Sequence, residues 1–342
     1  MRLSIRGATD NPINARRQLH PMRQLTIVDI LDAQRRIRPY LPATPLYTYP
    51  TLNMLLGFAA YVKHENHNPT GAFKVRGGIN LVSRLEPEEK ARGVVTASTG
   101  NHGQSIALAC SLFGVKAHIC VPVGANPDKV AAISSYGAEI VEHGRDFEEA
   151  KANAERLAQT HGYRYISSGD EPHLIAGVGT IGLEIIQQEP TIDTVISPVG
   201  AGTGCGGTAI AVKSINPEVK VVAVQAENAP SVYRSWRSGA LESTGPVSTM
   251  ADGLATRQAF QLPLGILRDW VDEFTLVSED EMRRGVRLYL EHCRTVAEGA
   301  GAAPLAAALK MRDELKGRRV ALVLSGGNIT LAELKRCLET PD

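Results

Sequence analysis

The chain has 342 residues, of which 43% are hydrophobic and 21% are charged, and its formal net charge is +1. This is the composition of a globular protein long enough for two domains, and the near-neutral charge gives no reason to expect a nucleic acid or a membrane as partner. The five cysteines are scattered and form no CxxC pair. They argue against a disulfide framework or a thiolate metal site and favour a cytoplasmic protein.

The N-terminal segment, residues 1–24, contains five arginines and a single acidic residue, Asp10. It lacks the apolar stretch of a secretory signal, so we interpret it as a basic, solvated arm, with an organelle transit peptide as the alternative. A helix is expected over residues 25–39, with Thr26 as its N-cap and Pro39 at its end.

After this helix, short apolar runs alternate with longer helical patterns. Such alternation predicts an α/β fold in which parallel sheets are covered by helices on both faces. A turn-rich stretch over residues 238–263 is expected to be a long surface excursion near the site. The expected strands are 59–65, 93–98, 116–123, 138–142, 194–199, 219–226, 273–277 and 319–325. The expected helices cover 99–114, 126–137, 145–162, 202–215 and 278–293, and one more starts near Lys74.

Two glycine-rich turns directly follow expected strands and open expected helices. Open α/β sheets bind ligands at the carboxyl ends of their strands, and a helix N-terminus attracts anions. The second turn, "SPVGAGTGCGG" over 197–207, has five glycines in eight positions from Gly200, which suits a phosphate held by backbone N–H groups. It is neither a Walker loop nor a dinucleotide fingerprint, because no Lys-Ser/Thr ends it and Gln225 ends the next strand. The alternative is a tight turn that only packs closely.

The first turn, "TASTGNHG" over 96–103, offers hydroxyl and amide groups from Ser98, Thr99 and Asn101. These donors suit a carboxylate, although Ser98 or Thr99 could instead simply cap the helix. A third turn, "ALVLSGGN" over 321–328, places Ser325 at the end of the last strand. The fourth motif is "NPTGAFKVRGG" over 68–78, which contains Lys74; a lone lysine at a helix start is usually solvated.

The four motifs occur in the order found in the fold type II pyridoxal-phosphate enzymes, which the chain resembles over residues 45–338. Within that family it looks most like serine/threonine dehydratases and serine racemase. The resemblance implies two parallel-sheet lobes of the tryptophan-synthase-β-like type. It implies a large pyridoxal-phosphate-binding domain made of 25–91 and 166–342 and a small mobile domain made of 92–165.

The resemblance also assigns roles to individual residues. Lys74 matches the lysine that forms the Schiff base with the aldehyde of pyridoxal 5'-phosphate. Phe73 would pack against this lysine and shield it from water. Glu298 in "AEGAGAA" matches a glutamate near the cofactor ring, and Ser325 matches the group that faces the pyridine nitrogen. Asn101 matches the asparagine that bonds the ring hydroxyl. The phosphate loop would comprise Gly200, Ala201, Gly202, Thr203 and Gly204. The loop for the substrate carboxylate would comprise Ser98, Thr99, Gly100, Asn101 and His102.

The implied activity is a lyase reaction that converts a 3-hydroxy amino acid of the threonine or serine class to a 2-oxo acid and ammonia. Three other activities of the same fold stay open: a hydroxyectoine-utilisation-type dehydratase with a bulkier substrate, a serine racemase, and a β-replacement synthase. Racemases place a serine, on the face opposite the lysine, where this chain has Thr99, so the resemblance makes Thr99 a catalytic candidate beside Lys74. A phosphate-binding regulator is the alternative outside enzymes.

Relatives imply a homodimer or homotetramer. Some relatives use carboxylates for a divalent metal where this chain has Gln225 and Ser231, so no metal site is expected.

Overall fold

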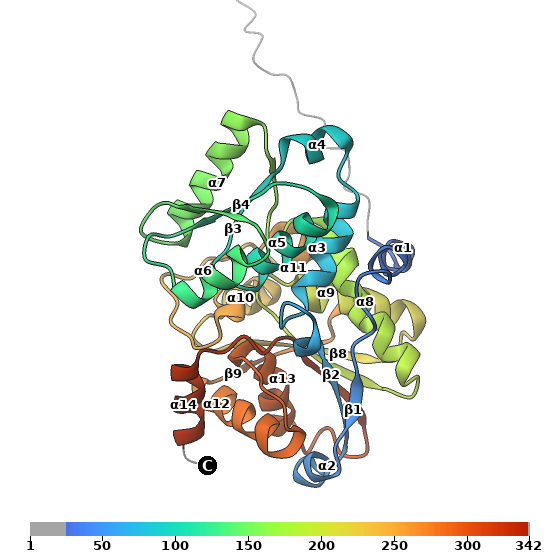
Figure 1. Cartoon of the computed structure of the whole chain (residues 1–342). Coiled ribbons are helices and arrows are strands. Elements are labelled where there is room, and N and C mark those ends of the chain that lie inside the picture. The colour runs from blue at the N-terminus through green and yellow to red at the C-terminus, as the bar shows by residue number, and fades with distance from the viewer. Residues whose placement is uncertain (1–24, 341–342) are drawn as a thin grey trace, which may run out of the picture.

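The computed structural model describes residues 25–340, which form two separate sheets flanked by helices (Figure 1). All neighbouring strands are parallel except β1 and β2, which are antiparallel. The six-stranded sheet has the order β1 (Leu46–Thr48), β2 (Ala59–His64), β10 (Arg319–Leu324), β7 (Thr194–Pro198), β8 (Lys220–Ala226) and β9 (Glu273–Val277). The four-stranded sheet has the order β5 (Glu139–Glu142), β4 (Ala117–Val121), β3 (Val94–Ala97) and β6 (Arg164–Tyr165).

The helices cover these sheets, and none that the structure describes has both the length and the apolarity needed to cross a bilayer. The predicted basic arm lies outside the described residues. The first seven helices are α1 (Ile27–Ile37), α2 (Pro50–Leu56), α3 (Lys74–Ser83), α4 (Pro87–Arg92), α5 (Asn101–Phe113), α6 (Pro127–Ser134) and α7 (Phe147–His161). The others are α8 (Pro172–Gln188), α9 (Thr203–Ile215), α10 (Ser231–Ser238), α11 (Gln261–Trp270), α12 (Glu279–Leu288), α13 (Gly299–Lys310) and α14 (Leu331–Glu339). Short turns of other helix types occur at Glu65–His67, Asp252–Leu254 and Tyr289–Cys293.

The six-stranded sheet is buried on both faces, as its continuous apolar strands predict. Along β10, Leu322 and Leu324 belong to the same apolar cluster as helices α12 and α13. Ala321 and Val323 face the other way, into the cluster that contains residues of α8 and α9. The predicted α/β architecture of two parallel-sheet lobes is therefore confirmed.

Helices α3, α8 and α9 pack backbone against backbone through glycines. A Cβ atom added to Gly177 of α8 would lie 2.7 Å from the carbonyl oxygen of Arg76 in α3. One added to Gly207 of α9 would lie 2.5 Å from the carbonyl oxygen of Ile175 in α8. The start of α3 and the start of α9 are thus held at a fixed separation by α8, which is the basis of the site described below.

The turn-rich stretch between α10 and α11 reaches both lobes. Its Asp252 pairs with Lys129 of α6, and its Arg257 forms an ion pair of 3.4 Å with Asp146 at the start of α7. Its Gly253 lies against the glycine turn at Gly200, where an added Cβ would be 2.0 Å from the Gly253 oxygen. The expected surface excursion is thus present and contacts both α6 and α7 of one lobe and the glycine turn of the other.

Candidate active site

Lys74 is the first residue of α3, and its amine reaches the start of α9. Its Nζ donates a hydrogen bond of 3.1 Å to Oγ1 of Thr203, and it lies 5.2 Å from the centre of the Phe73 ring. The N–H of Phe73 donates to the carbonyl oxygen of Ser325 at 3.0 Å, which fixes the start of α3 against the end of β10. Burial of the amine lowers the pKa of Lys74 to about 8. A larger share of this amine than of an ordinary lysine is therefore neutral and nucleophilic near neutral pH.

The glycine turn that precedes α9 is a cradle of bare backbone. Gly202 has a φ of +91°, a conformation that favours glycine, and Gly200 has no room for a side chain beside Gly253. At Gly204 an added Cβ would lie 2.8 Å from the Phe73 ring, so the cradle closes around the aromatic residue next to Lys74. The turn leads into the N-terminus of α9, whose free N–H groups and positive partial charge favour an anion at the cradle.

Two side chains of the 98–102 loop, Ser98 and His102, bond to other groups of the protein. The Ser98 oxygen accepts hydrogen bonds from the N–H groups of Gly100, at 3.2 Å, and Gly103, at 3.0 Å, so the capping interpretation holds for this hydroxyl. His102 is buried, and its Nε2 lies 3.1 Å from Oγ1 of Thr96, which itself donates to the Ile166 carbonyl. Nε2 therefore carries the proton in this contact. Burial and the charge of Lys74 lower the pKa of His102 to about 3, so its ring is neutral.

Asn101 is held from both ends of its amide. Its Nδ2 donates to Oε1 of Glu298 at 2.8 Å, and its Oδ1 accepts from Nδ2 of Asn328 at 2.8 Å. Asn328 also donates to the carbonyl oxygen of Thr70, four residues before Lys74. The predicted residues Asn101 and Glu298 are thus in contact, and Asn328 is a further member that the motif "SGGN" contained but to which sequence reasoning gave no role.

Ser325 is 3% exposed at the end of β10. It lines a small cavity together with Phe73, Ser197, Gly204 and Val323. Residues of three motifs therefore line this cavity, where the carboxyl ends of β7 and β10 meet the starts of α3 and α9. The 96–103 motif is joined to the end of β10 through the hydrogen bond between Asn101 and Asn328.

A family model described as "Pyridoxal-phosphate dependent enzyme" matches residues 37–326 of this chain. The chain belongs to the pyridoxal-phosphate-dependent enzyme family. L-threonine ammonia-lyase of Thermotoga maritima is 40% identical over 314 residues, which cover 92% of this chain and 78% of the relative. Serine racemase of Dictyostelium discoideum is 37% identical over 94% of this chain and 100% of the relative. The structure of threonine deaminase isoform 2 from Solanum lycopersicum superposes with a TM-score of 0.88 at 32% identity and covers 92% of each chain.

The cofactor of this family is pyridoxal phosphate, and the residues present fit it. The phosphate needs backbone donors without side chains in the way, and positions 200, 202 and 204 leave no space for a Cβ without a shift of their neighbours. The aldehyde reacts with a neutral amine, and burial of Lys74 increases the neutral fraction of its amine by lowering its pKa to about 8. A phosphate arm and an aldehyde on neighbouring carbons of one ring match these two features, because the Lys74 amine lies 3.1 Å from Thr203 at the start of α9.

Glu298 is a weaker acid than an ordinary glutamate. Burial, with the Asp252 charge adding to it, raises the pKa of Glu298 to about 7, although the hydrogen bond from Asn101 acts in the opposite direction. Between about pH 4.5 and 7 the folded carboxyl holds a proton that the unfolded chain has released, so this group makes folding less favourable as pH rises.

We therefore expect Glu298→Gln to stabilise the cofactor-free protein at pH 8, and to change its stability little at about pH 5. The glutamine keeps an oxygen that accepts from Asn101 but never becomes charged. Melting temperatures of both proteins at the two pH values check this. An equal shift at both values would show that the charge of Glu298 is not the cause.

Replacing Asn328 with alanine removes the donor that fixes Oδ1 of Asn101. We expect the affinity for pyridoxal phosphate to fall roughly tenfold, because Oδ1 of the half-buried Asn101 is left without its partner and the amide is free to rotate. Titration followed by the cofactor absorbance measures this. Asn228→Ala is a matched control, because its amide makes only an exposed contact of 3.4 Å with Glu279. Unchanged affinity in Asn328→Ala would contradict the orienting role.

Gln225 and Ser231, the two positions considered above for a divalent metal, bond to the protein itself. Oε1 of Gln225 accepts from the N–H of Tyr233 at 3.0 Å, and Oγ of Ser231 donates to the carbonyl oxygen of Thr256 at 2.5 Å. Within residues 25–340 no group of three His, Cys, Asp or Glu side chains could hold a metal ion. The lack of a divalent site stays a prediction.

Proposed function

We propose that this protein is an ammonia-lyase that converts a 3-hydroxy amino acid of the threonine or serine class to a 2-oxo acid and ammonia. The observation that carries the proposal is the contact of 3.1 Å between the Lys74 amine and Thr203 at the glycine cradle. It supports Lys74 as the residue that binds the cofactor covalently. The names of the relatives in Thermotoga maritima and Solanum lycopersicum support this class of substrate.

Pyridoxal phosphate, when bound, supplies an aldehyde that condenses with an amine with loss of water and a ring that withdraws electrons from the amino acid's α-carbon. Lys74, once released, is placed to take the α-proton with its neutral amine. The cradle from Gly200 to Gly204, Thr203 included, holds the phosphate. Ser325 would face the pyridine nitrogen with a neutral hydroxyl, which cannot keep that nitrogen protonated as a carboxylate could, and the weaker electron sink would favour elimination.

The backbone N–H groups of the loop 98–102 bind the substrate carboxylate in this proposal, because the Ser98 oxygen is already an acceptor within the loop. Asn101 offers its second amide hydrogen to the ring hydroxyl. Thr99 is half-buried at the tip of the loop, and a serine racemase is among the relatives, so racemisation is the second candidate activity.

The test is a panel of 3-hydroxy amino acids, including serine, threonine, 3-hydroxyaspartate and bulkier members, assayed for 2-oxo acid and ammonia. We expect both products in equal amounts from at least one L-amino acid without any added thiol. If none yields a 2-oxo acid while serine is racemised, the lyase assignment is wrong. Product that appears only with an added nucleophile would show a β-replacement synthase.

A homodimer or homotetramer and a cytoplasmic location remain predictions. Light scattering of the purified protein gives the first, and fractionation of the source cells gives the second.

A further inference from the structure

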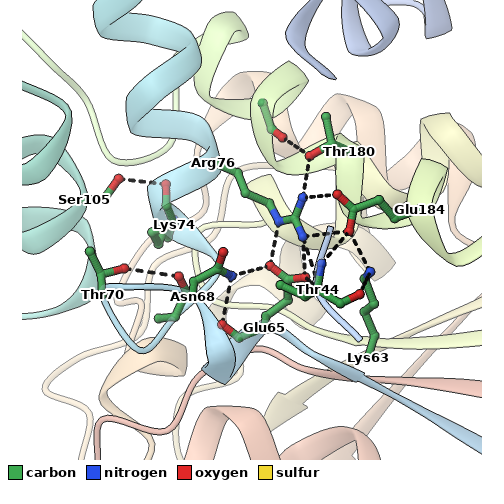
Figure 2. Close-up of polar contacts among 12 residues, drawn as sticks. Thr44, Lys63, Glu65, Asn68, Thr70, Lys74, Arg76, Ser105, Thr180 and Glu184 are labelled. Carbon is green, nitrogen blue, oxygen red and sulfur yellow. Dashed lines mark hydrogen bonds and ion pairs between the residues drawn. The ribbon is translucent and has the colours of Figure 1, made fainter. Parts of the chain in front are cut away.

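Four charged side chains are buried together around Arg76 of α3 (Figure 2). Lys63 and Glu65 are 0% exposed, Arg76 is 1% exposed, and Glu184 is 6% exposed. They come from the end of β2, the short turn after it, α3 and α8. We call them the buried ionic cluster. Arg76 follows Lys74 by two residues in the same helix, so the cluster and the amine share one rigid element.

Arg76 binds two carboxylates, each through two hydrogen bonds. Its Nε and Nη2 donate to Glu65 at 2.7 and 2.8 Å, and its Nη1 and Nη2 donate to Glu184 at 2.6 and 2.8 Å. Nη1 also donates to the Thr180 hydroxyl at 3.1 Å. Such paired contacts fix the orientation of a guanidinium, as a single point charge does not.

Lys63 completes the cluster. Its Nζ donates to Glu184 at 2.6 Å, to the carbonyl oxygen of Thr44 at 2.8 Å and to Gln188 at 3.0 Å, which uses all three of its hydrogens. Burial lowers the pKa of Lys63, although the charges of Glu65 and Glu184 act in the opposite direction, and its three donated hydrogen bonds are those of an ammonium group. With both carboxylates ionised, the cluster has no net charge. Burial alone would raise the pKa of Glu65, yet the charges of Arg76 and Lys63 lower it, so the carboxylate is ionised.

Stability alone is a weak explanation for this arrangement. A buried ion pair loses so much hydration that apolar residues of the same volume often stabilise a fold equally well or better. What apolar residues do not provide is a fixed direction and distance between the elements that they join. We therefore look to the cluster for a role in fixing the positions of the elements that it joins.

The cluster holds both ends of the segment that carries Lys74. Before the lysine, Asn68 donates to Oε2 of Glu65 at 2.8 Å, and its carbonyl oxygen accepts from the N–H of Gly71 at 2.7 Å, which shapes the loop. After the lysine, Arg76 binds the same carboxylate. Glu184 then joins α3 to α8, the helix whose backbone packs on α9 and so fixes the position of Thr203.

We propose that the buried ionic cluster is a positioning device that sets the reach of the Lys74 amine relative to the phosphate cradle. This inference rests on the proposed covalent role of Lys74. On this view the cluster governs formation of the covalent bond with the aldehyde, while binding of the ring and phosphate depends on α9 and Asn101. Arg76 and Glu184 are positioning residues, since neither touches the reacting atoms.

The experiment compares two ligands in the full-length protein: pyridoxal phosphate and pyridoxine phosphate, which has an alcohol in place of the aldehyde. In Arg76→Met we expect the affinity for pyridoxal phosphate to fall roughly tenfold to hundredfold, because a small displacement of a reacting group has effects of this size. The affinity for pyridoxine phosphate should change less than about threefold. Arg76→Lys should recover only part of the loss, because it keeps the charge without the paired geometry.

Arg84→Met is the matched control. Arg84 caps the other end of α3 and pairs with Asp32 where both side chains are partly exposed, so its loss should leave both affinities unchanged. Should Arg76→Met fail to fold, Glu184→Gln replaces it, and the same selective loss is expected because one carboxylate no longer holds Arg76 and Lys63.

Equal losses for both ligands in the cluster variants, or no loss for either, would overturn the positioning role and leave a structural one. The proposed role of Lys74 is tested separately by borohydride reduction of the wild-type protein with pyridoxal phosphate and mass analysis of its peptides. A label on Lys74 with unchanged ligand selectivity in the variants refutes this inference alone. A label elsewhere refutes the role of Lys74 itself.

Discussion

The Lys74→Ala variant is expected to lose at least ~10³-fold in kcat for 2-oxo acid formation, measured with the substrate that is best for the wild-type protein. The variant lacks both the amine that binds the aldehyde and the base that takes the α-proton. Its cradle is intact, since Thr203 keeps its place at the start of α9. The variant should therefore still bind pyridoxal phosphate through the phosphate, but without covalent attachment.

The control for this prediction is Lys335→Ala, which removes an exposed lysine of α14 whose side chain is 76% accessible and pairs only loosely with Glu339. It should retain wild-type kcat and wild-type borohydride labelling. Lyase activity within tenfold of wild type in Lys74→Ala would show that another group binds the aldehyde, and the proposed site would have to be abandoned.

The strands could be predicted from the sequence where they are long and buried on both faces. All eight expected strands are present, because runs such as 319–325 and 219–226 are almost entirely apolar. The two strands that were not predicted, β1 and β6, have only three and two residues. Sequences this short carry no periodicity, and their pairing depends on neighbouring strands that lie elsewhere in the chain.

The residues of the candidate site could be predicted where a motif contains them. The structure places Lys74 in contact with Thr203, Asn101 in contact with Glu298, and Ser325 in contact with Phe73. Their individual roles remain predictions. Asn328 and the buried ionic cluster were missed for a physical reason. Their partners come from distant parts of the chain, as with Arg76 and Glu184, which are 108 positions apart. A buried arginine in a helix looks the same in sequence as a solvated one.

Helix α8 was also missed, and the glycines within it explain why. Gly177, Gly179 and Gly182 lower the helix propensity of its sequence. In the structure these glycines are contact points, because they let α8 touch the backbones of α3 and α9. What weakens the helix as an isolated segment is thus what allows the three helices to place the lysine beside the cradle.

This view makes opposite predictions for two glycines in helix interiors. Gly207→Ala in α9 places a Cβ 2.5 Å from the Ile175 carbonyl oxygen and 2.8 Å from the N–H nitrogen of Gly179, both of which are backbone atoms that cannot turn aside. The helices must separate, so we expect the free energy of unfolding to fall by about 1–3 kcal/mol. Cofactor affinity should fall as well, because the start of α9 moves with the helix.

Gly265→Ala in α11 is the matched control, because a Cβ there meets no atom within 4 Å. Alanine restricts the unfolded chain and favours the helix, so this variant should gain about 0.5–1 kcal/mol in the free energy of unfolding and keep wild-type cofactor affinity. Urea unfolding of both variants measures the difference. A Gly207→Ala protein as stable as Gly265→Ala would mean that α8 and α9 do not pack backbone to backbone, and the fixed separation between Lys74 and the cradle would lose its structural basis.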